Sequence, residues 1–153
     1  MNLIAGIDPG LSGAIALLGG AAEVEIADMP TLEIKGKRII DLYALAQLFD
    51  LAGKDTRLAV IEDPHAMPGQ GVSSMFKFGF ACGAVQAMVA SAFIPMKLVA
   101  PGAWKKAMGL GSDKDASRRL ASQLMPRHAH LWARKKDDGR AEALLLAIYG
   151  SKL

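Results

Sequence analysis

The chain begins with three short segments of the kind that form β-strands. Residues 2–8 alternate apolar and small side chains and end at Asp8 before a Pro-Gly pair, so they predict a strand that stops there. Residues 14–18 and 23–28 predict two further strands, separated by a Gly-Gly pair. Together these segments predict an antiparallel three-stranded meander.

Helical and strand patterns alternate in the rest of the chain. Residues 31–38 are polar and predict a loop, whereas residues 39–51 carry apolar side chains at helical spacing. Residues 58–61 are an unbroken apolar run that ends in Glu62, which is typical of a strand buried on both faces. The remaining patterns predict, in order, a helix at 72–92, a strand at 95–99 and helices at 101–108, 113–124 and 138–149. The chain is therefore expected to be an α/β protein.

One segment also needs testing as a membrane span. Residues 78–96 contain almost no polar side chains, but they include Gly79, Gly83 and Pro95 and lack interfacial anchors. We therefore expect a helix covered on nearly all sides, followed by a buried strand, and no membrane association. The two glycines form a flat stripe for close packing against either the sheet or a second subunit.

Length and cysteine content restrict the class of protein. A chain of 153 residues, 52% of them hydrophobic, predicts a single folded domain over residues 1–153 and excludes a mostly disordered chain. Cys82 is the only cysteine and cannot form an internal disulfide. With no secretion signal recognised at the N-terminus, we expect a cytoplasmic protein, either bacterial or, if phage-encoded, in the host cytoplasm.

The charge is distributed unevenly along the chain. Residues 1–96 carry six Lys or Arg and ten Asp or Glu, a net charge of −4, whereas residues 97–153 carry twelve and five, a net charge of +7. This asymmetry suggests an acidic site in the first part and a surface for a polyanion in the last third. A solvated basic face explains the charge alone equally well.

Four acidic residues stand at the boundaries of predicted elements. Asp8 and Glu62 each end a strand, and they meet at one end of the sheet if the two strands are parallel neighbours. Asp138 and Glu142 lie four residues apart on one face of the last helix, although an N-cap with a solvated glutamate would give the same pattern. Four carboxylates without a His or Cys cluster suit Mg²⁺ or Mn²⁺. Beside a basic surface, this pattern is typical of a nuclease.

Several motifs occur in an order that resembles a known family. The motifs are GIDPG at residues 6–10, followed by SGAIAL, then AVIE at 59–62, KFGFACGAV at 77–85, VAPGAWKKAMGL at 99–110 and KKDDGRAEALLLAIYG at 135–150. This ordered set spans nearly the whole chain and resembles the RuvC-type Holliday junction resolvases of the ribonuclease H-like superfamily, particularly their phage and prophage members. Each motif alone is weak.

The resemblance implies a fold, an activity and an assembly. The fold would be ribonuclease H-like, with a five-stranded mixed sheet, antiparallel in its first three strands and then parallel, and helices on both faces. The activity would be symmetric paired nicking of a four-way (Holliday) DNA junction by two-metal-ion phosphodiester hydrolysis, with two Mg²⁺ or Mn²⁺ ions per active site. The protein would be a homodimer formed through the helix at 72–92. A partner branch-migration helicase remains unknown.

The resemblance also assigns roles to individual residues. The metal ligands would be Asp8, Glu62, Asp138 and Glu142, and Lys105 and Lys114 match basic residues near the scissile phosphate. Contacts to the DNA backbone are expected from Lys106, Arg118, Arg119, Lys135 and Lys136, with a solvated surface charge as the alternative for each.

This sequence departs from the family pattern in two places. The family commonly places an acid or His three residues before the last acid, where this chain has Gly139, so Asp138 is chosen as the ligand and Asp137 is its rival. The family often has an aromatic wedge three residues after the second acid, where this chain has His65; Met67 or Phe76 could serve instead.

Other functions share some of these features. A less selective nuclease for Y-shaped or fork DNA would have the same fold, and a non-enzymatic DNA-binding protein could retain it. Actin-like and Hsp70-like ATPases also hold phosphate with a turn like GIDPG, but they need two related domains, and 153 residues supply one.

Overall fold

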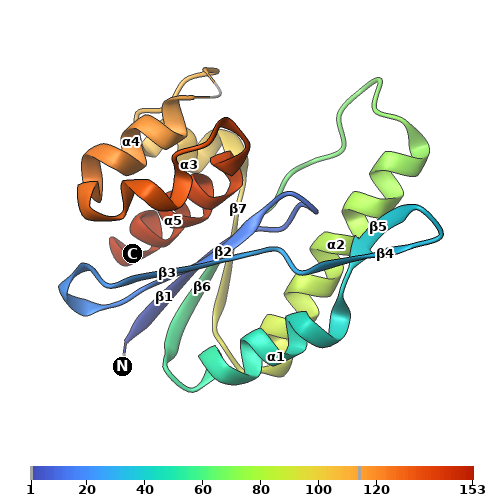
Figure 1. Cartoon of the computed structure of the whole chain (residues 1–153), viewed down its shortest axis with the longest axis horizontal. Helices are drawn as coiled ribbons and strands as arrows, with labels where there is room; N and C mark the ends of the chain where they lie inside the picture. Colours follow the sequence, from blue (N-terminus) through green and yellow to red (C-terminus); the bar gives the residue numbers. More distant parts are fainter. Residues whose placement is uncertain (1, 114) are drawn as a thin grey trace.

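A five-stranded mixed sheet forms the centre of the molecule (Figure 1). The computed structural model describes residues 2–113 and 115–153. The sheet order is β3-β2-β1-β6-β7, with strands β1 (Leu3–Asp8), β2 (Ala14–Leu18), β3 (Val24–Asp28), β6 (Thr56–Glu62) and β7 (Met96–Val99). The first three strands are antiparallel, and β6 and β7 run parallel to β1. The expected sheet is confirmed.

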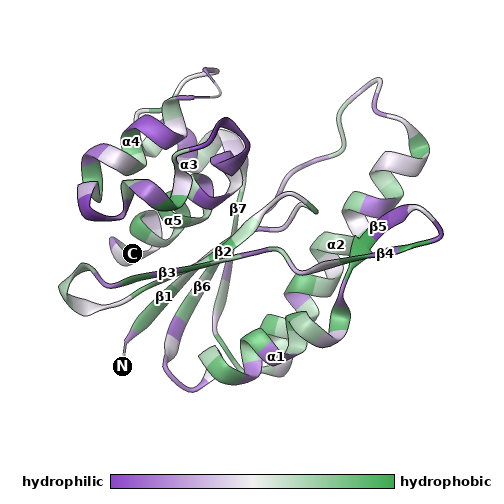
Figure 2. Ribbon diagram, viewed as in Figure 1, coloured by the Kyte–Doolittle hydropathy of each residue, from purple (hydrophilic) through white to green (hydrophobic). Residues whose placement is uncertain are grey.

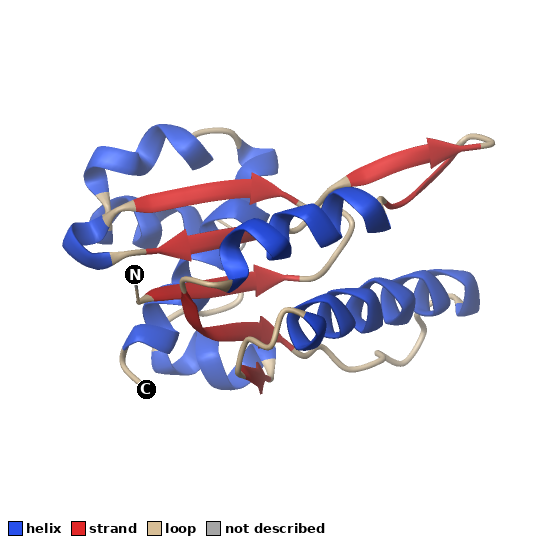
Figure 3. Ribbon diagram, turned by 90° about the horizontal axis from the view of Figure 1, so that it is seen from below, coloured by secondary structure: helices blue, strands red, loops and turns tan. Residues whose placement is uncertain are grey.

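Helices cover both faces of the sheet because successive strand residues point to opposite sides (Figure 3). Ile4 of β1 packs in a core with α5 (Asp138–Ser151), whereas Ile7 packs in a second core with α1 (Leu42–Gly53) and α2 (Val72–Ser91). In β6, Val60 packs in the core with α5, and Ile61 packs in the core with α1 and α2.

Helix α5 lies unusually close to the sheet. A Cβ atom on Gly6 of β1 would stand only 2.0 Å from the carbonyl oxygen of Ala143 in α5. A Cβ atom on Gly150 would stand 2.5 Å from Cγ2 of Val60. Glycine at both positions therefore lets the α5 backbone rest directly on β1 and β6, and this contact fixes the helix beside the ends of these strands.

The prediction of a loop at residues 31–38 is wrong, because this segment is part of a β-hairpin. The hairpin consists of β4 (Thr31–Ile34) and β5 (Lys37–Ile40), and it projects beside α2 in Figure 1. Lys35 and Gly36 form its turn with φ of 50° and 73°, so the Lys-Gly pair between two β-branched segments was the missed signal. Helix α1 consequently starts at Leu42 instead of residue 39, after Asp41, whose side chain accepts a hydrogen bond from the Ala44 amide at 3.0 Å.

The C-terminal part contains more helix than the sequence predicted. Besides α3 (Pro101–Ala107) and α4 (Ala116–Leu124), it has the 3₁₀ segments η2 (Pro126–Trp132) and η3 (Lys135–Asp137); η1 (Gly20–Ala22) joins β2 to β3. The segment that carries His128 and His130 is therefore helical. Trp132 anchors it, since its ring is buried and its indole N–H donates to Ser122 Oγ at 2.9 Å.

Within one chain, helix α2 is covered on one side only. Only Ala81, Val85 and Val89 are buried, and they pack against α1 and the sheet. On its outer side, Phe76 is 77% exposed and Phe80 is 51% exposed. By length and hydropathy alone, α2 is also the one helix in the described residues that could cross a membrane. In Figure 2 the ribbon of α2 is mostly green to white, which marks apolar to neutral residues, whereas the ribbon around α4 contains much more purple, which marks hydrophilic residues.

Candidate active site

Two carboxylates stand at the same end of the sheet. Asp8 ends β1 and Glu62 ends β6, and the register pairs the preceding residues, Ile7 and Ile61. Adjacent strands are about 4.8 Å apart, so the two side chains leave neighbouring points of the sheet edge. Both acids are partly buried. The parallel arrangement expected from the sequence is therefore present.

Helix α5 adds the other two acids. Its first turn packs against the turn after β1, where a Cβ on Gly139 would stand 2.5 Å from the carbonyl oxygen of Ser12. This contact explains why glycine occupies the position at which the family commonly has a ligand. Glu142 lies in the next turn of α5 with 19% of its side chain exposed, and Asp138 is the exposed first residue of the helix.

Neighbouring donors hold two of these carboxylates. The indole N–H of Trp104 donates to Glu62 Oε2 at 2.7 Å. Lys105 Nζ lies 3.2 Å from Glu142 Oε1, and the Ser117 hydroxyl donates to the same oxygen at 3.4 Å. Lys105 Nζ also lies 5.5 Å from the centroid of the Trp104 ring. Consecutive residues of α3 thus position one acid from the sheet and one from α5.

This role of Trp104 was not predicted from the sequence. The ring is fully buried, as expected for a core residue. A buried indole N–H needs an acceptor, however, and Glu62 is the acceptor here. The useful signal was a tryptophan directly before the lysine that matches the family motif.

The site has an excess of negative charge. Burial, together with the charges of Glu62, Glu142 and Asp138, raises the pKa of Asp8 to about 7. Burial also raises the pKa of Glu62, partly offset by the Trp104 hydrogen bond. The other three predicted ligands therefore all repel the ionised form of Asp8, and a cation bound among the four carboxylates would relieve this repulsion.

The carboxylates suit a divalent ion in chemistry and charge. Their oxygens are hard donors of the kind that Mg²⁺ and Mn²⁺ prefer, and the repulsion at Asp8 is what a cation would relieve. Within the described residues, no three His, Cys, Asp or Glu side chains are already close enough together to hold one ion. Glu62 and Glu142 are instead bonded to Trp104 and Lys105.

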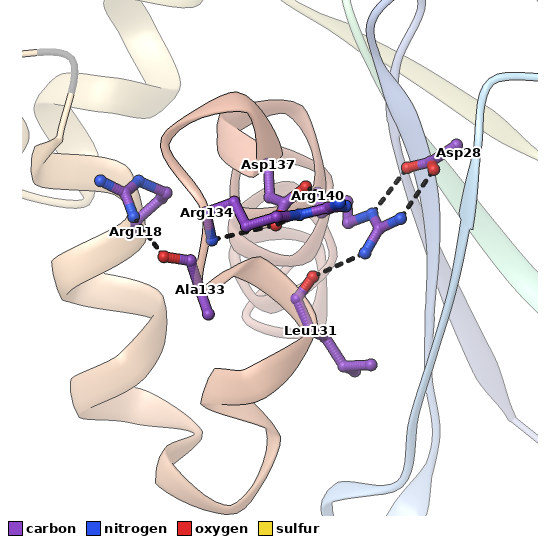
Figure 4. A network of polar contacts seen from close by, with 7 residues as sticks. All are labelled: Asp28, Arg118, Leu131, Ala133, Arg134, Asp137 and Arg140. Atoms are coloured by element: carbon purple, nitrogen blue, oxygen red, sulfur yellow. Dashed lines mark hydrogen bonds and ion pairs between the residues drawn. The ribbon is translucent and has the colours of Figure 1, made fainter.

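The geometry favours Asp138 over Asp137 as the fourth acid. Both carboxylate oxygens of Asp137 accept hydrogen bonds from the Arg134 guanidinium, at 3.0 and 2.9 Å, and one also accepts from the Arg134 amide (Figure 4). These bonds hold the pKa of Asp137 below its usual range. Asp137 therefore closes the turn before α5.

The predicted basic residues lie in different environments. Lys105 is in the site. Its neighbour in α3, Lys106, is exposed, and so are Lys135 and Lys136 of η3. Arg118 and Arg119 are engaged within the protein, because they form ion pairs with Asp115 and Asp113, and Arg118 also donates to the Ala133 carbonyl. The prediction for Lys114 falls outside the described residues.

The three candidates for a wedge at the crossover are all accessible. His65 and Met67 lie in the exposed loop after β6, and Phe76 is in the first turns of α2. Cys82 of α2 is half-buried rather than fully buried. Burial raises the pKa of its thiol to about 11, and Asp63, Asp8 and Glu62 contribute, so α2 passes close to the acidic site.

A mixed sheet with carboxylates at the ends of adjacent central strands, closed by an acidic helix, defines a ribonuclease H-like α/β fold of the RuvC type. The chain has this fold in common with Thermus thermophilus RuvC in complex with a Holliday junction substrate. The TM-score is 0.63 and the identity 18%, and the match covers 99% of this chain and 93% of that chain. The yeast mitochondrial Holliday junction resolvase Ydc2 matches with a TM-score of 0.54 and 15% identity, over 97% of this chain and 77% of its own.

A sequence relative leads to the same group of proteins. The chain is 28% identical over 133 residues to the chloroplastic Holliday junction resolvase MOC1 of Chlamydomonas reinhardtii. The match covers 84% of this chain but only 15% of the length of that relative. No family model matches the chain. The comparisons confirm the fold and the resemblance that the sequence motifs indicated.

Proposed function

We propose that the protein is a metal-dependent DNA endonuclease that resolves four-way junctions by paired nicks. The observation that carries this proposal is the placement of Asp8 and Glu62 at the ends of adjacent parallel strands, with Glu142 brought to them by α5. The sequence likeness to a Holliday junction resolvase supports the choice of substrate.

Each residue of the site would have a separate role in hydrolysis. Asp8, Glu62, Glu142 and Asp138 would hold two Mg²⁺ or Mn²⁺ ions, which supply an activated water and charge compensation for the leaving oxygen. Trp104 keeps Glu62 oriented through its indole N–H. Lys105, which bonds Glu142 here, is placed to hold a non-bridging phosphate oxygen once DNA is bound.

We further propose a homodimer through the outer face of α2, defined by Val72, Phe76, Gly79, Phe80 and Gly83. This face is exposed and apolar, and a Cβ at either glycine would meet nothing within 4 Å. An exposed apolar surface of this kind is typical of a protein–protein contact. Two subunits would supply the two active sites that paired nicks require.

The test uses end-labelled four-way, Y-shaped and linear duplex DNA, with Mg²⁺ or with EDTA. We expect paired nicks in the four-way junction, only with Mg²⁺, and none with Asp8→Asn or Glu62→Gln, which should still bind the junction. Full cleavage by either variant would exclude the proposed site. Equal cleavage of Y-shaped DNA would favour the less selective nuclease, and binding without cleavage would favour a non-enzymatic protein.

A further inference from the structure

A polar pocket lies next to the acidic site, on the side of the sheet edge away from Lys105. Its volume is about 300 Å³. It is lined by the turn after β1, the end of β3, the start of β4, Arg38 of β5 and residues of η3. We call it the hairpin pocket, because the β4–β5 hairpin forms one wall.

The two acids in its wall are neutralised. Both carboxylate oxygens of Asp28 accept hydrogen bonds from Arg140 at 2.7 Å, and the remaining Arg140 nitrogen donates to the Leu131 carbonyl (Figure 4). Asp137 is bound by Arg134 in the same way. These pairs hold the pKa of both aspartates below the usual range, so both carboxylates stay ionised and paired with an arginine, and they contribute little net negative charge.

Two cations of the hairpin pocket have no such partner. Within the described residues, neither Arg38 nor Lys136 forms an ion pair with a carboxylate. Arg38 instead donates one hydrogen bond, at 2.7 Å, to the hydroxyl of Ser12. Both side chains are exposed, so the pocket has two free positive charges that point to an anionic ligand.

The pocket directly adjoins Asp8. A Cβ on Gly13, which lines the pocket, would stand 2.9 Å from Asp8 Oδ1. In the sheet, Asp8 pairs with Ala14 and Ala14 pairs with Asp28, so Asp28 lies two strands, or about 10 Å, from Asp8. A DNA strand that crosses Asp8 would therefore reach the pocket within a few nucleotides. Lys105 lies on the opposite flank, toward β6.

We propose that the hairpin pocket binds a backbone phosphate of the strand being cut, held by Arg38 and Lys136 a few nucleotides from the scissile bond. This inference rests on the proposed nuclease function and adds a contact on the second side of the site. A strand held at Lys105 and at the hairpin pocket would cross Asp8 in one direction, which fixes the phosphate that reaches the acids.

The experiment measures four-way junction binding over a range of salt concentrations, without divalent ions, for wild type, Arg38→Gln and Lys136→Gln. Each variant should lower the slope of log K against log salt by about one and weaken binding about tenfold near 0.1 M salt. Arg38→Lys should restore most of the slope because it keeps the charge. The matched control is Arg57→Gln, an exposed arginine of β6 at the far end of the sheet, which should behave as wild type.

The structural role of Arg38 is tested by Ser12→Ala, which removes its partner but no charge. A wild-type slope in Ser12→Ala together with a reduced slope in Arg38→Gln supports the phosphate site. If wild type nicks the junction and both glutamine variants keep its slope, the phosphate site is wrong and the nuclease proposal stands. If wild type neither binds nor nicks the junction, both proposals fail.

Discussion

A single indole N–H orients Glu62. Trp104 is fully buried, and its bond to Glu62 Oε2 is 2.7 Å long. Such a donor fixes a carboxylate against rotation and lowers the cost of its burial, as the opposing effects on the pKa of Glu62 show. The geometry of the acids therefore depends on a residue that would not itself touch metal or DNA.

Trp104→Phe should keep the ring packing and remove this bond. We expect the nicking rate to fall by about 10- to 100-fold and the Mg²⁺ concentration for half-maximal activity to rise, because Glu62 loses its orientation. The matched control is Trp132→Phe, whose indole N–H serves Ser122 instead. If both variants lose the same stability and the same activity, with unchanged Mg²⁺ dependence, Trp104 has only a packing role.

The raised pKa of Asp8 predicts a pH-dependent stability of the metal-free protein. Asp8 titrates near pH 7 when folded and near its ordinary value of 3.8 when unfolded, so the unfolded state binds fewer protons between these values. Stability should then fall as the pH rises from about 4 to 7, since ionisation is disfavoured only in the folded state. Asp8→Asn removes this loss and should be more stable at pH 8, by on the order of 4 kcal/mol.

Denaturant unfolding of wild type and Asp8→Asn in EDTA, at several pH values, measures this difference. The advantage of the variant should disappear near pH 4. Asp50→Asn changes an exposed carboxylate of α1 in the same way and should show no such trend. A difference between wild type and Asp8→Asn that is independent of pH would contradict the raised pKa.

At the scale of elements, the contact between α5 and β1 determines where the acids meet. Glu142 can approach Asp8 because Gly6 and Gly139 remove side chains that would separate the helix from the sheet and from the turn after β1. The α5 backbone is thus part of the wall of the active site. Small changes in this contact would move Glu142 relative to the two strand ends.

Gly6→Ala should accordingly be strongly destabilising, by more than about 3 kcal/mol, because the new Cβ would overlap the Ala143 carbonyl and the Ala147 amide nitrogen. Gly102→Ala in α3 provides the control, since Gly102 is exposed, its Cβ would meet nothing within 4 Å and alanine favours a helix. Thermal unfolding measures both. Equal melting temperatures for the two variants would show that α5 can shift away without cost.

The sequence predicted the elements whose patterns are strong and local. The end of β1 at Asp8, the end of β6 at Glu62 and the long α2 all follow from apolar runs bounded by turn residues. The hairpin was missed because its few apolar positions are outweighed by charged neighbours, and a Lys-Gly turn is a weak signal. Contacts such as Trp104 with Glu62 join residues 42 positions apart, so no local pattern could indicate them.

At the scale of the whole molecule, the rest of the chain leaves the outer face of α2 uncovered. A helix expected to be covered on nearly all sides is buried along one stripe, and its phenylalanines 76 and 80 are exposed. The high content of apolar residues, which excluded a disordered chain, is therefore not confined to the core. Part of it remains available for a second copy of the chain.

Phe76→Glu and Phe80→Glu should each convert the proposed dimer into a monomer without unfolding it, because both side chains are exposed in the single chain. Sedimentation equilibrium measures the change, and circular dichroism checks that the fold is retained. Tyr43→Glu is the control, since Tyr43 is an 88% exposed aromatic residue of α1. A monomeric wild type at micromolar concentration would contradict the proposed assembly.

Because α2 packs on the core with one side and would bind a second subunit with the other, the stability of each subunit should depend on the protein concentration. The buried residues of α2, which are Ala81, Val85 and Val89, pack in the same core as Ile7, the residue before Asp8. The outer face of α2 would be covered only by a partner subunit. Mass action then makes the melting temperature depend on protein concentration. Dilution would loosen the helix behind the acids as well as separate the subunits, so nuclease activity should fall more steeply than the number of molecules. Cleavage would thereby be confined to conditions in which two active sites are present together.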